Sequence, residues 1–210
     1  GEERISLHMN SQIVDVSGFK GNFTSTVETA AGDRYDIQHG AIILATGAKE
    51  YRGEEYRHHE SPLIVTQGDF EHMLTGDLSF PGRHTPQRVV MIQCVGPAEK
   101  YCSRICCTTA LKNALYLKKA HPDTQITILY KDIRVYGFKE NLYTEAREQG
   151  VIFLRYDDQH PPEVNLQGES PTAADPRAPL TVQAWAPRLG RRVDLPSDML
   201  VLSIPLVPHD

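Results

Sequence analysis

Apolar and polar residues alternate along much of the first forty residues, which is the pattern of strands with one face exposed. Residues 12–16 and 23–28 alternate, and a turn at Gly32-Asp33 precedes a return strand at 35–38. Residues 41–45 are continuously apolar instead, which predicts a strand buried on both faces. The amino-terminal part is therefore predicted to be β-rich.

One helix is predicted in the next stretch. Thr66 stands three residues before Asp69, which is a capping box, and Gly76 is a typical helix stop. Residues 78–87 contain proline and glycine and are predicted to form a linker. This change of pattern predicts a β-rich first domain with one helix over 1–83 and a second domain over 84–210.

From Arg88 onward, strand and helix patterns alternate, which predicts an α/β domain. The expected strands are 89–95, 125–130 and 151–156, and the expected helices are 106–119 and 139–149. This order predicts a right-handed parallel sheet of Rossmann type. Residues 163–167 and 180–186 predict a hairpin, and 199–202 predict a last buried strand.

Composition and charge narrow the class of protein. The chain has 210 residues, 40% of them hydrophobic, and a formal net charge of −5, which argues against a general binder of nucleic acid. No window has the ~18 apolar residues that a membrane span requires. The chain opens on Gly1, and its acidic first residues lack the apolar core of a signal peptide.

All four cysteines lie within one short segment, at positions 94, 102, 106 and 107. Disulfides that staple a secreted domain would be spread along the chain, so this clustering indicates a metal or redox site in a reducing compartment, by default the cytoplasm. Cys94 ends a predicted parallel strand, where α/β sheets place ligands. A helix that begins near Cys102 would bring Cys102 and Cys106 onto one face.

Several chemistries suit this cysteine set. Four thiolates favour an iron–sulfur cluster modestly over zinc, because zinc sites usually pair two widely separated cysteine knuckles. A single cysteine is often just a small apolar core residue, but four in one loop indicate a site. A thiol–disulfide oxidoreductase that uses Cys106 or Cys107 as nucleophile, and a structural zinc module for docking, are the alternatives.

The chain resembles a known family, the A subunit of heterodisulfide reductase and its relatives, over residues 12–207. Those proteins contain FAD and iron–sulfur clusters, and their fold is that of flavoproteins with two dinucleotide-binding domains, like pyridine nucleotide-disulfide oxidoreductases. The resemblance rests on the strings VDVSGFKGNF, AIILATGAKEYRGEEY, VTQGDFE, IQCVG, YCSRICCTTALKNAL, ILYKDIRVYGF and LYTEAREQGVIFLRY.

The resemblance implies specific roles for some residues. In the family the cysteines of this motif ligate a [4Fe-4S] cluster, and this role transfers to Cys94, Cys102, Cys106 and Cys107. Thr46 and Gly47 match a segment that passes near FAD. The implied function is an electron-transfer module that relays electrons between FAD and the partner subunits of a redox complex.

The sequence departs from the family where FAD is held. No GxGxxG fingerprint for the FAD pyrophosphate occurs in the chain, so we expect an internal piece of a longer protein that binds FAD weakly or not at all. The turn after Cys94 has only Gly96 where a nicotinamide dinucleotide needs several glycines, so NAD(P)H binding is not expected.

Because parallel strands end at one edge, Arg134, Tyr136 and Gly137 are expected beside the cysteine loop.

Overall fold

The computed structural model describes residues 4–77, 79–97, 102–167 and 179–208. The chain divides between Gly47 and Ala48 into two compact units. Within the described residues, no helix has the length and apolar character to cross a membrane.

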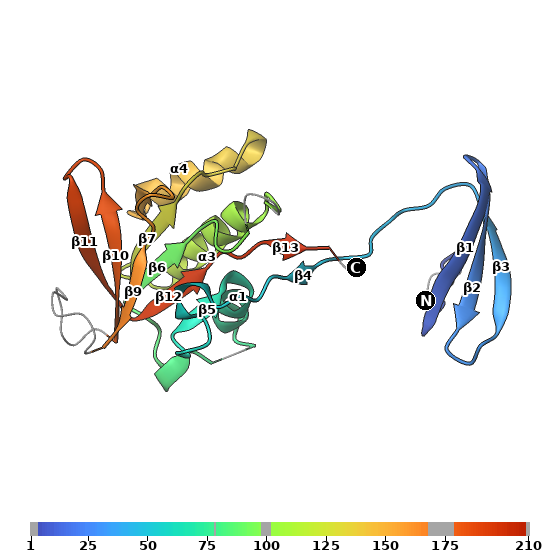
Figure 1. Ribbon diagram of the computed structural model, residues 1–210, viewed down its shortest axis with the longest axis horizontal. Helices are drawn as coiled ribbons and strands as arrows, with labels where there is room; N and C mark the ends of the chain where they lie inside the picture. The colour runs from blue at the N-terminus through green and yellow to red at the C-terminus, as the bar shows by residue number, and fades with distance from the viewer. Residues whose placement is uncertain (1–3, 78, 98–101, 168–178, 209–210) are drawn as a thin grey trace. The chain divides into compact units, whose positions relative to one another are not determined.

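The first unit is an antiparallel meander (Figure 1). Its strands are β1 (Ser11–Phe19), β2 (Asn22–Thr29) and β3 (Arg34–His39), which confirms the three predicted strands. The strand predicted at 41–45 is wrong, because these residues form no strand and are exposed, Ile43 by 91%. A strand buried on both faces needs neighbouring strands and covering layers, and the described part of this unit supplies neither to 41–45.

The second unit is built on a five-stranded sheet in which every pairing is parallel. Its spatial order is β5-β12-β6-β7-β8. The bounds are β5 (Ile64–Thr66), β6 (Arg88–Ile92), β7 (Gln125–Tyr130), β8 (Ile152–Arg155) and β12 (Met199–Leu202). The parallel α/β sheet predicted from the alternation of strands and helices is confirmed, and it gains β5 as an additional edge strand.

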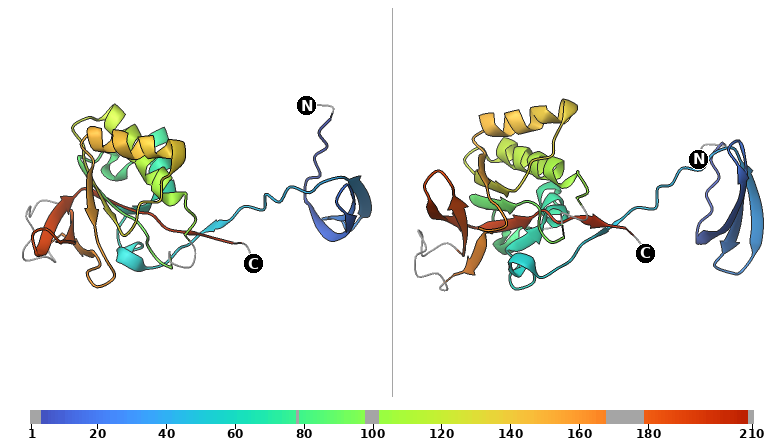
Figure 2. Two further views of the ribbon diagram at one scale, coloured as in Figure 1. Left: turned by 90° about the horizontal axis from the view of Figure 1, so that it is seen from above. Right: turned by 45° about the horizontal axis from the view of Figure 1, so that its top comes forward.

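Helices cover one face of this sheet and a small antiparallel sheet covers the other (Figure 2). The helices are α1 (Gln67–Thr75), α3 (Cys106–Ala120) and α4 (Glu140–Glu148). The second sheet contains β9 (Glu163–Leu166), β10 (Leu180–Ala186) and β11 (Arg191–Ser197), and the predicted hairpin is its β9–β10 pair. The remaining elements are β4 (Lys49–Glu50), β13 (Leu206–Val207), η1 (Glu55–Arg57), η2 (Pro81–Arg83) and η3 (Gly137–Lys139).

The alternation of side chains along β6 explains why both faces must be covered. Val89 and Met91 pack into the core under the helices, whereas Val90 and Ile92 pack against the antiparallel sheet. Successive residues of a strand point to opposite faces, so a strand whose residues are apolar on both faces is stable only between two layers.

The division between the units differs from the predicted domain boundary between 83 and 84. Residues 48–83 belong to the α/β unit, because β5 hydrogen bonds to β12 and Phe70 of α1 lies fully buried in the core beside α3. The predicted helix itself is confirmed: the Thr66 hydroxyl accepts a hydrogen bond from the Asp69 amide, and the Asp69 carboxylate accepts one from the Thr66 amide.

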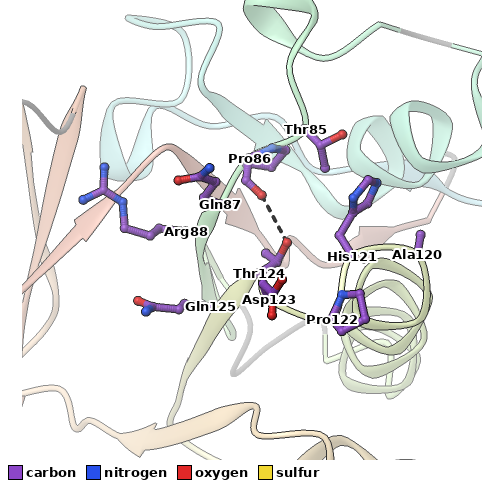
Figure 3. A pocket seen from close by; sticks show the side chains of 10 residues that line it. All are labelled: Thr85, Pro86, Gln87, Arg88, Ala120, His121, Pro122, Asp123, Thr124 and Gln125. Carbon is purple, nitrogen blue, oxygen red and sulfur yellow. Dashed lines mark hydrogen bonds between the residues drawn. The ribbon is translucent and has the colours of Figure 1, made fainter.

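Asp198 ties the two central strands together at their amino ends. Its carboxylate accepts hydrogen bonds from the backbone amides of Gln87 at 3.1 Å and Arg88 at 2.9 Å, and from the Arg88 guanidinium at 2.7 Å. Figure 3 shows the cavity at this end of the sheet, about 680 Å³ in volume and lined by residues 85–88 and 120–125. Ligands of open α/β sheets bind at the opposite, carboxyl end of the strands, so this cavity is not our candidate site.

We predict that Asp198→Ala lowers the free energy of unfolding by about 2 kcal/mol, because partly buried donors lose a charged acceptor. Urea unfolding followed by circular dichroism measures this change. Asp157→Ala is the matched control, since the Asp157 side chain is 59% exposed and pairs with the nearby His160, and its cost should stay within about 0.5 kcal/mol. Equal losses in the two variants would contradict the role of Asp198.

Candidate functional site

The four cysteines line one cavity at the carboxyl end of the parallel sheet, as their spacing predicts. The cavity has a volume of about 110 Å³, and its walls come from the segments that follow β6, β7 and β12 and from the start of α3. Its lining residues are Cys94, Cys102, Ser103, Cys106, Cys107, Lys131, Asp132, Arg134, Ser203 and Pro205.

Cys94 reaches this cavity through an unusual backbone conformation. It follows β6 with a φ of 59°, in the left-handed region that is rare for residues other than glycine. The Val95 amide hydrogen bonds to the Ser203 carbonyl at 3.2 Å, which holds the β6 and β12 ends together beyond the sheet. Left-handed non-glycine residues cluster at functional sites, where the surrounding structure fixes them.

The other cysteines lie at and before the start of α3. Cys106 and Cys107 occupy its first turn, but the helix does not begin near Cys102. The helix predicted over 106–119 is confirmed. The condition for Cys102 and Cys106 to share a helical face is not met, because Arg104 has a φ of 59° and interrupts any helix before Cys106. Cys106 and Cys107 consequently sit at the positive end of the helix dipole, which stabilises thiolates.

Cys106 and Cys107 have opposite tendencies to ionise. A hydrogen bond from the Cys107 thiol, opposed by burial, lowers the pKa of Cys106 to about 6. The same hydrogen bond and burial raise the pKa of Cys107. Cys106 is therefore the more readily ionised of the two, with the Cys107 thiol as hydrogen-bond donor to it.

The segment after β7 faces the cysteines with its backbone. Burial raises the pKa of Cys94, while the backbone amides of Asp132 and Lys131 act in the opposite direction. The backbone amide of Arg134 likewise acts to lower the pKa of Cys107. The Cys107 thiol lies 3.9 Å from the Asp132 carbonyl oxygen, so this segment contacts the cysteines from β6 and from α3.

Ser203 supplies a polar group without a partner. The residue is 1% exposed, lines the cysteine cavity, and its hydroxyl makes no hydrogen bond within the described part of the chain. Buried hydroxyls are nearly always hydrogen bonded, so an unpaired one beside four thiols fits a cavity that holds a group with acceptor atoms. Thiolate ligands together with this donor suit an iron–sulfur cluster, whose sulfur atoms accept hydrogen bonds.

Thr46 and Gly47, which the resemblance places near FAD, are exposed and belong to the first unit. Arg134 lines the cavity, whereas Tyr136 and Gly137 do not. Among the described residues, no group of three or more His, Cys, Asp or Glu side chains is arranged to hold a single metal ion.

Sequence reasoning missed Lys131 and Ser203 as lining residues. Both follow strands of the parallel sheet, β7 and β12, so the signal was their place just after a predicted strand. This signal identifies Ser203 only when β12 is known to lie beside β6, and about one hundred residues separate these two strands in sequence.

Curated relatives of the chain are named as A subunits of heterodisulfide reductases. The chain is 42% identical over 133 residues to the A subunit of the ferredoxin:CoB-CoM heterodisulfide reductase of Methanosarcina acetivorans, covering 60% of this chain and 15% of that protein. It is 37% identical over 188 residues to the iron-sulfur A subunit of the CoB-CoM heterodisulfide reductase of Methanocaldococcus jannaschii, covering 81% and 27%. It is 32% identical over 195 residues to the A subunit of the H2:CoB-CoM heterodisulfide,ferredoxin reductase of Methanothermobacter marburgensis. That match covers 85% of this chain and 28% of that protein.

Solved structures with a similar course of the chain are flavoproteins. The cadaverine monooxygenase DfoA of Erwinia amylovora, bound to FAD, has a TM-score of 0.49 and 9% identity, over 96% of this chain and 53% of that one. LpdA of Mycobacterium tuberculosis has a TM-score of 0.44 and 14% identity, over 95% and 36%. No protein-family model matches the chain.

The matches to these curated relatives cover 60–85% of the chain. The chain spans 15–28% of the length of these relatives. Over that span it is homologous to the A subunit of heterodisulfide reductase.

Proposed function

We propose that the chain is an electron-transfer module that binds one [4Fe-4S] cluster through Cys94, Cys102, Cys106 and Cys107. The observation that carries the proposal is the convergence of all four cysteines, from two separate segments, on one cavity at the carboxyl end of the sheet. In a four-iron cluster each cysteine binds a different iron atom, so its ligands need not converge on a single point.

The chain's own residues have defined tasks in this proposal. A bound cluster supplies one-electron transfer. Cys94 and Cys107 anchor it from the sheet and the helix, Ser203 donates a hydrogen bond towards it, and the backbone amides after β7 offset the negative charge of the thiolates.

The wider setting is also a proposal. The relatives are named as subunits of heterodisulfide reductases, which favours other redox subunits as partners. The clustered cysteines favour a reducing compartment, by default the cytoplasm. We propose that Thr46 and Gly47 lie near FAD in the complete flavoprotein and that the module relays electrons between this FAD and the partner subunits. Neither nucleic acid nor a membrane has a place in this scheme.

A thiol–disulfide oxidoreductase is the second candidate, favoured by the lowered pKa of Cys106 beside the Cys107 thiol. In that reaction the Cys106 thiolate would attack a substrate disulfide, release one substrate thiolate and form a mixed disulfide. Attack by Cys107 would then release the second substrate thiolate and form a Cys106–Cys107 disulfide, which an external dithiol would reduce by becoming a disulfide itself. A structural zinc module is the third. Metal and sulfide analysis separates the three functions, because they require iron with sulfide, no metal, or zinc.

We expect anaerobic reconstitution with iron and sulfide to give four iron atoms per chain and a brown protein. Alanine at any one of the four cysteine positions should abolish or reshape the visible spectrum and lower the iron content, because one ligand is lost. Thr109→Ala is the control, since Thr109 lies on α3 but does not line the cavity. Unchanged iron in all four cysteine variants would exclude the proposed ligand set.

We also expect no saturable binding of NADH or NADPH, with or without the cluster. A pyrophosphate must approach the turn after β6 closely, but a Cβ placed on Gly96 would come within 2.5 Å of the Tyr51 ring, so that space is filled. Tyr51 is fixed by a 2.8 Å hydrogen bond to Glu55. Calorimetric titration measures this, and micromolar affinity would revive a pyridine-nucleotide oxidoreductase.

A further inference from the structure

We infer that Arg134 is a positioning residue that raises the reduction potential of the cluster by placing a permanent positive charge beside Cys102. This inference rests on the proposed function, because it concerns the same cavity. Arg134 is not one of the proposed ligands and lies outside the cysteine motif in the sequence.

The Arg134 guanidinium lies at the cavity and is oriented by one ion pair. Its Nε lies 3.1 Å from Oδ2 of Asp132, two residues earlier in the same segment. Arg134 and Cys102 line the same cavity. Asp132, and after it Cys102, raises the pKa of Arg134, in agreement with this placement.

Two basic residues line the cavity, and each forms an ion pair. Lys131 pairs with Asp158, which is not a lining residue. Arg134 pairs with Asp132, whose carboxylate is 65% exposed and is the acidic group of the lining. Arg134 is the basic lining residue whose pKa Cys102 raises, which places its charge beside that cysteine.

The sign of the effect follows from electrostatics. Reduction adds one electron to the cluster, so a nearby positive charge stabilises the reduced form more than the oxidised form. Arginine stays protonated at every accessible pH, so its contribution does not change with pH. The side chain is 49% exposed, so salt should weaken the contribution.

The test compares the potentials of reconstituted Arg134→Gln, Arg134→Lys and unaltered protein, measured by redox titration with electron paramagnetic resonance. We expect Arg134→Gln to lower the reduced-to-oxidised ratio at a fixed potential up to about tenfold, which equals ~59 mV for a one-electron couple. Arg134→Lys keeps the charge and should restore most of the shift. Arg147→Gln makes the same charge change on α4, outside the cavity lining, and should leave the potential unchanged.

Salt dependence distinguishes a charge effect from a structural one. Raising the ionic strength should move the potential of the unaltered protein towards that of Arg134→Gln, and iron content should be equal in both. Equal potentials at equal iron content would overturn this inference and leave the proposed function intact. A protein that assembles no cluster would overturn both.

Discussion

The parallel register of three strands is the constraint on which the site depends. Ile92 of β6 is paired with Leu129 of β7 on one side and Leu202 of β12 on the other. The residues that follow these strands therefore emerge together at one edge, and they include Cys94, Lys131 and Ser203. A slip of one residue would turn every side chain of a strand to the opposite face, so the two-sided core also fixes the geometry of the cavity.

Local patterns were sufficient to predict most elements of the α/β unit. The strand at 125–130 and the last strand at 199–202 have the predicted bounds, because segments rich in β-branched and apolar residues are stable inside a covered sheet. The same rule failed at 41–45. An apolar run indicates that burial would be favourable. It does not indicate whether neighbouring strands and covering layers are present to bury it.

Long-range pairing explains the remaining differences. The linker-like composition of 78–87 suggested a domain boundary, yet β5 joins the sheet through β12, which lies far away in sequence. The clustering of cysteines revealed their convergence, whereas the contribution of Ser203 depends on the insertion of β12 between β5 and β6. The start of α3 depends on the left-handed backbone at Arg104, which no local propensity indicates.

Collecting four thiols in one partly buried cavity has an electrostatic cost, since thiolates repel one another and burial disfavours each charge. The structure offsets this cost from three directions. The amino terminus of α3 carries no acidic residue in its first turn, backbone amides after β7 face two of the cysteines, and Arg134 faces a third. These groups come from different elements that meet only in the folded sheet. The cysteine motif therefore supplies the thiols, while the topology of the sheet places backbone amides and a guanidinium beside them.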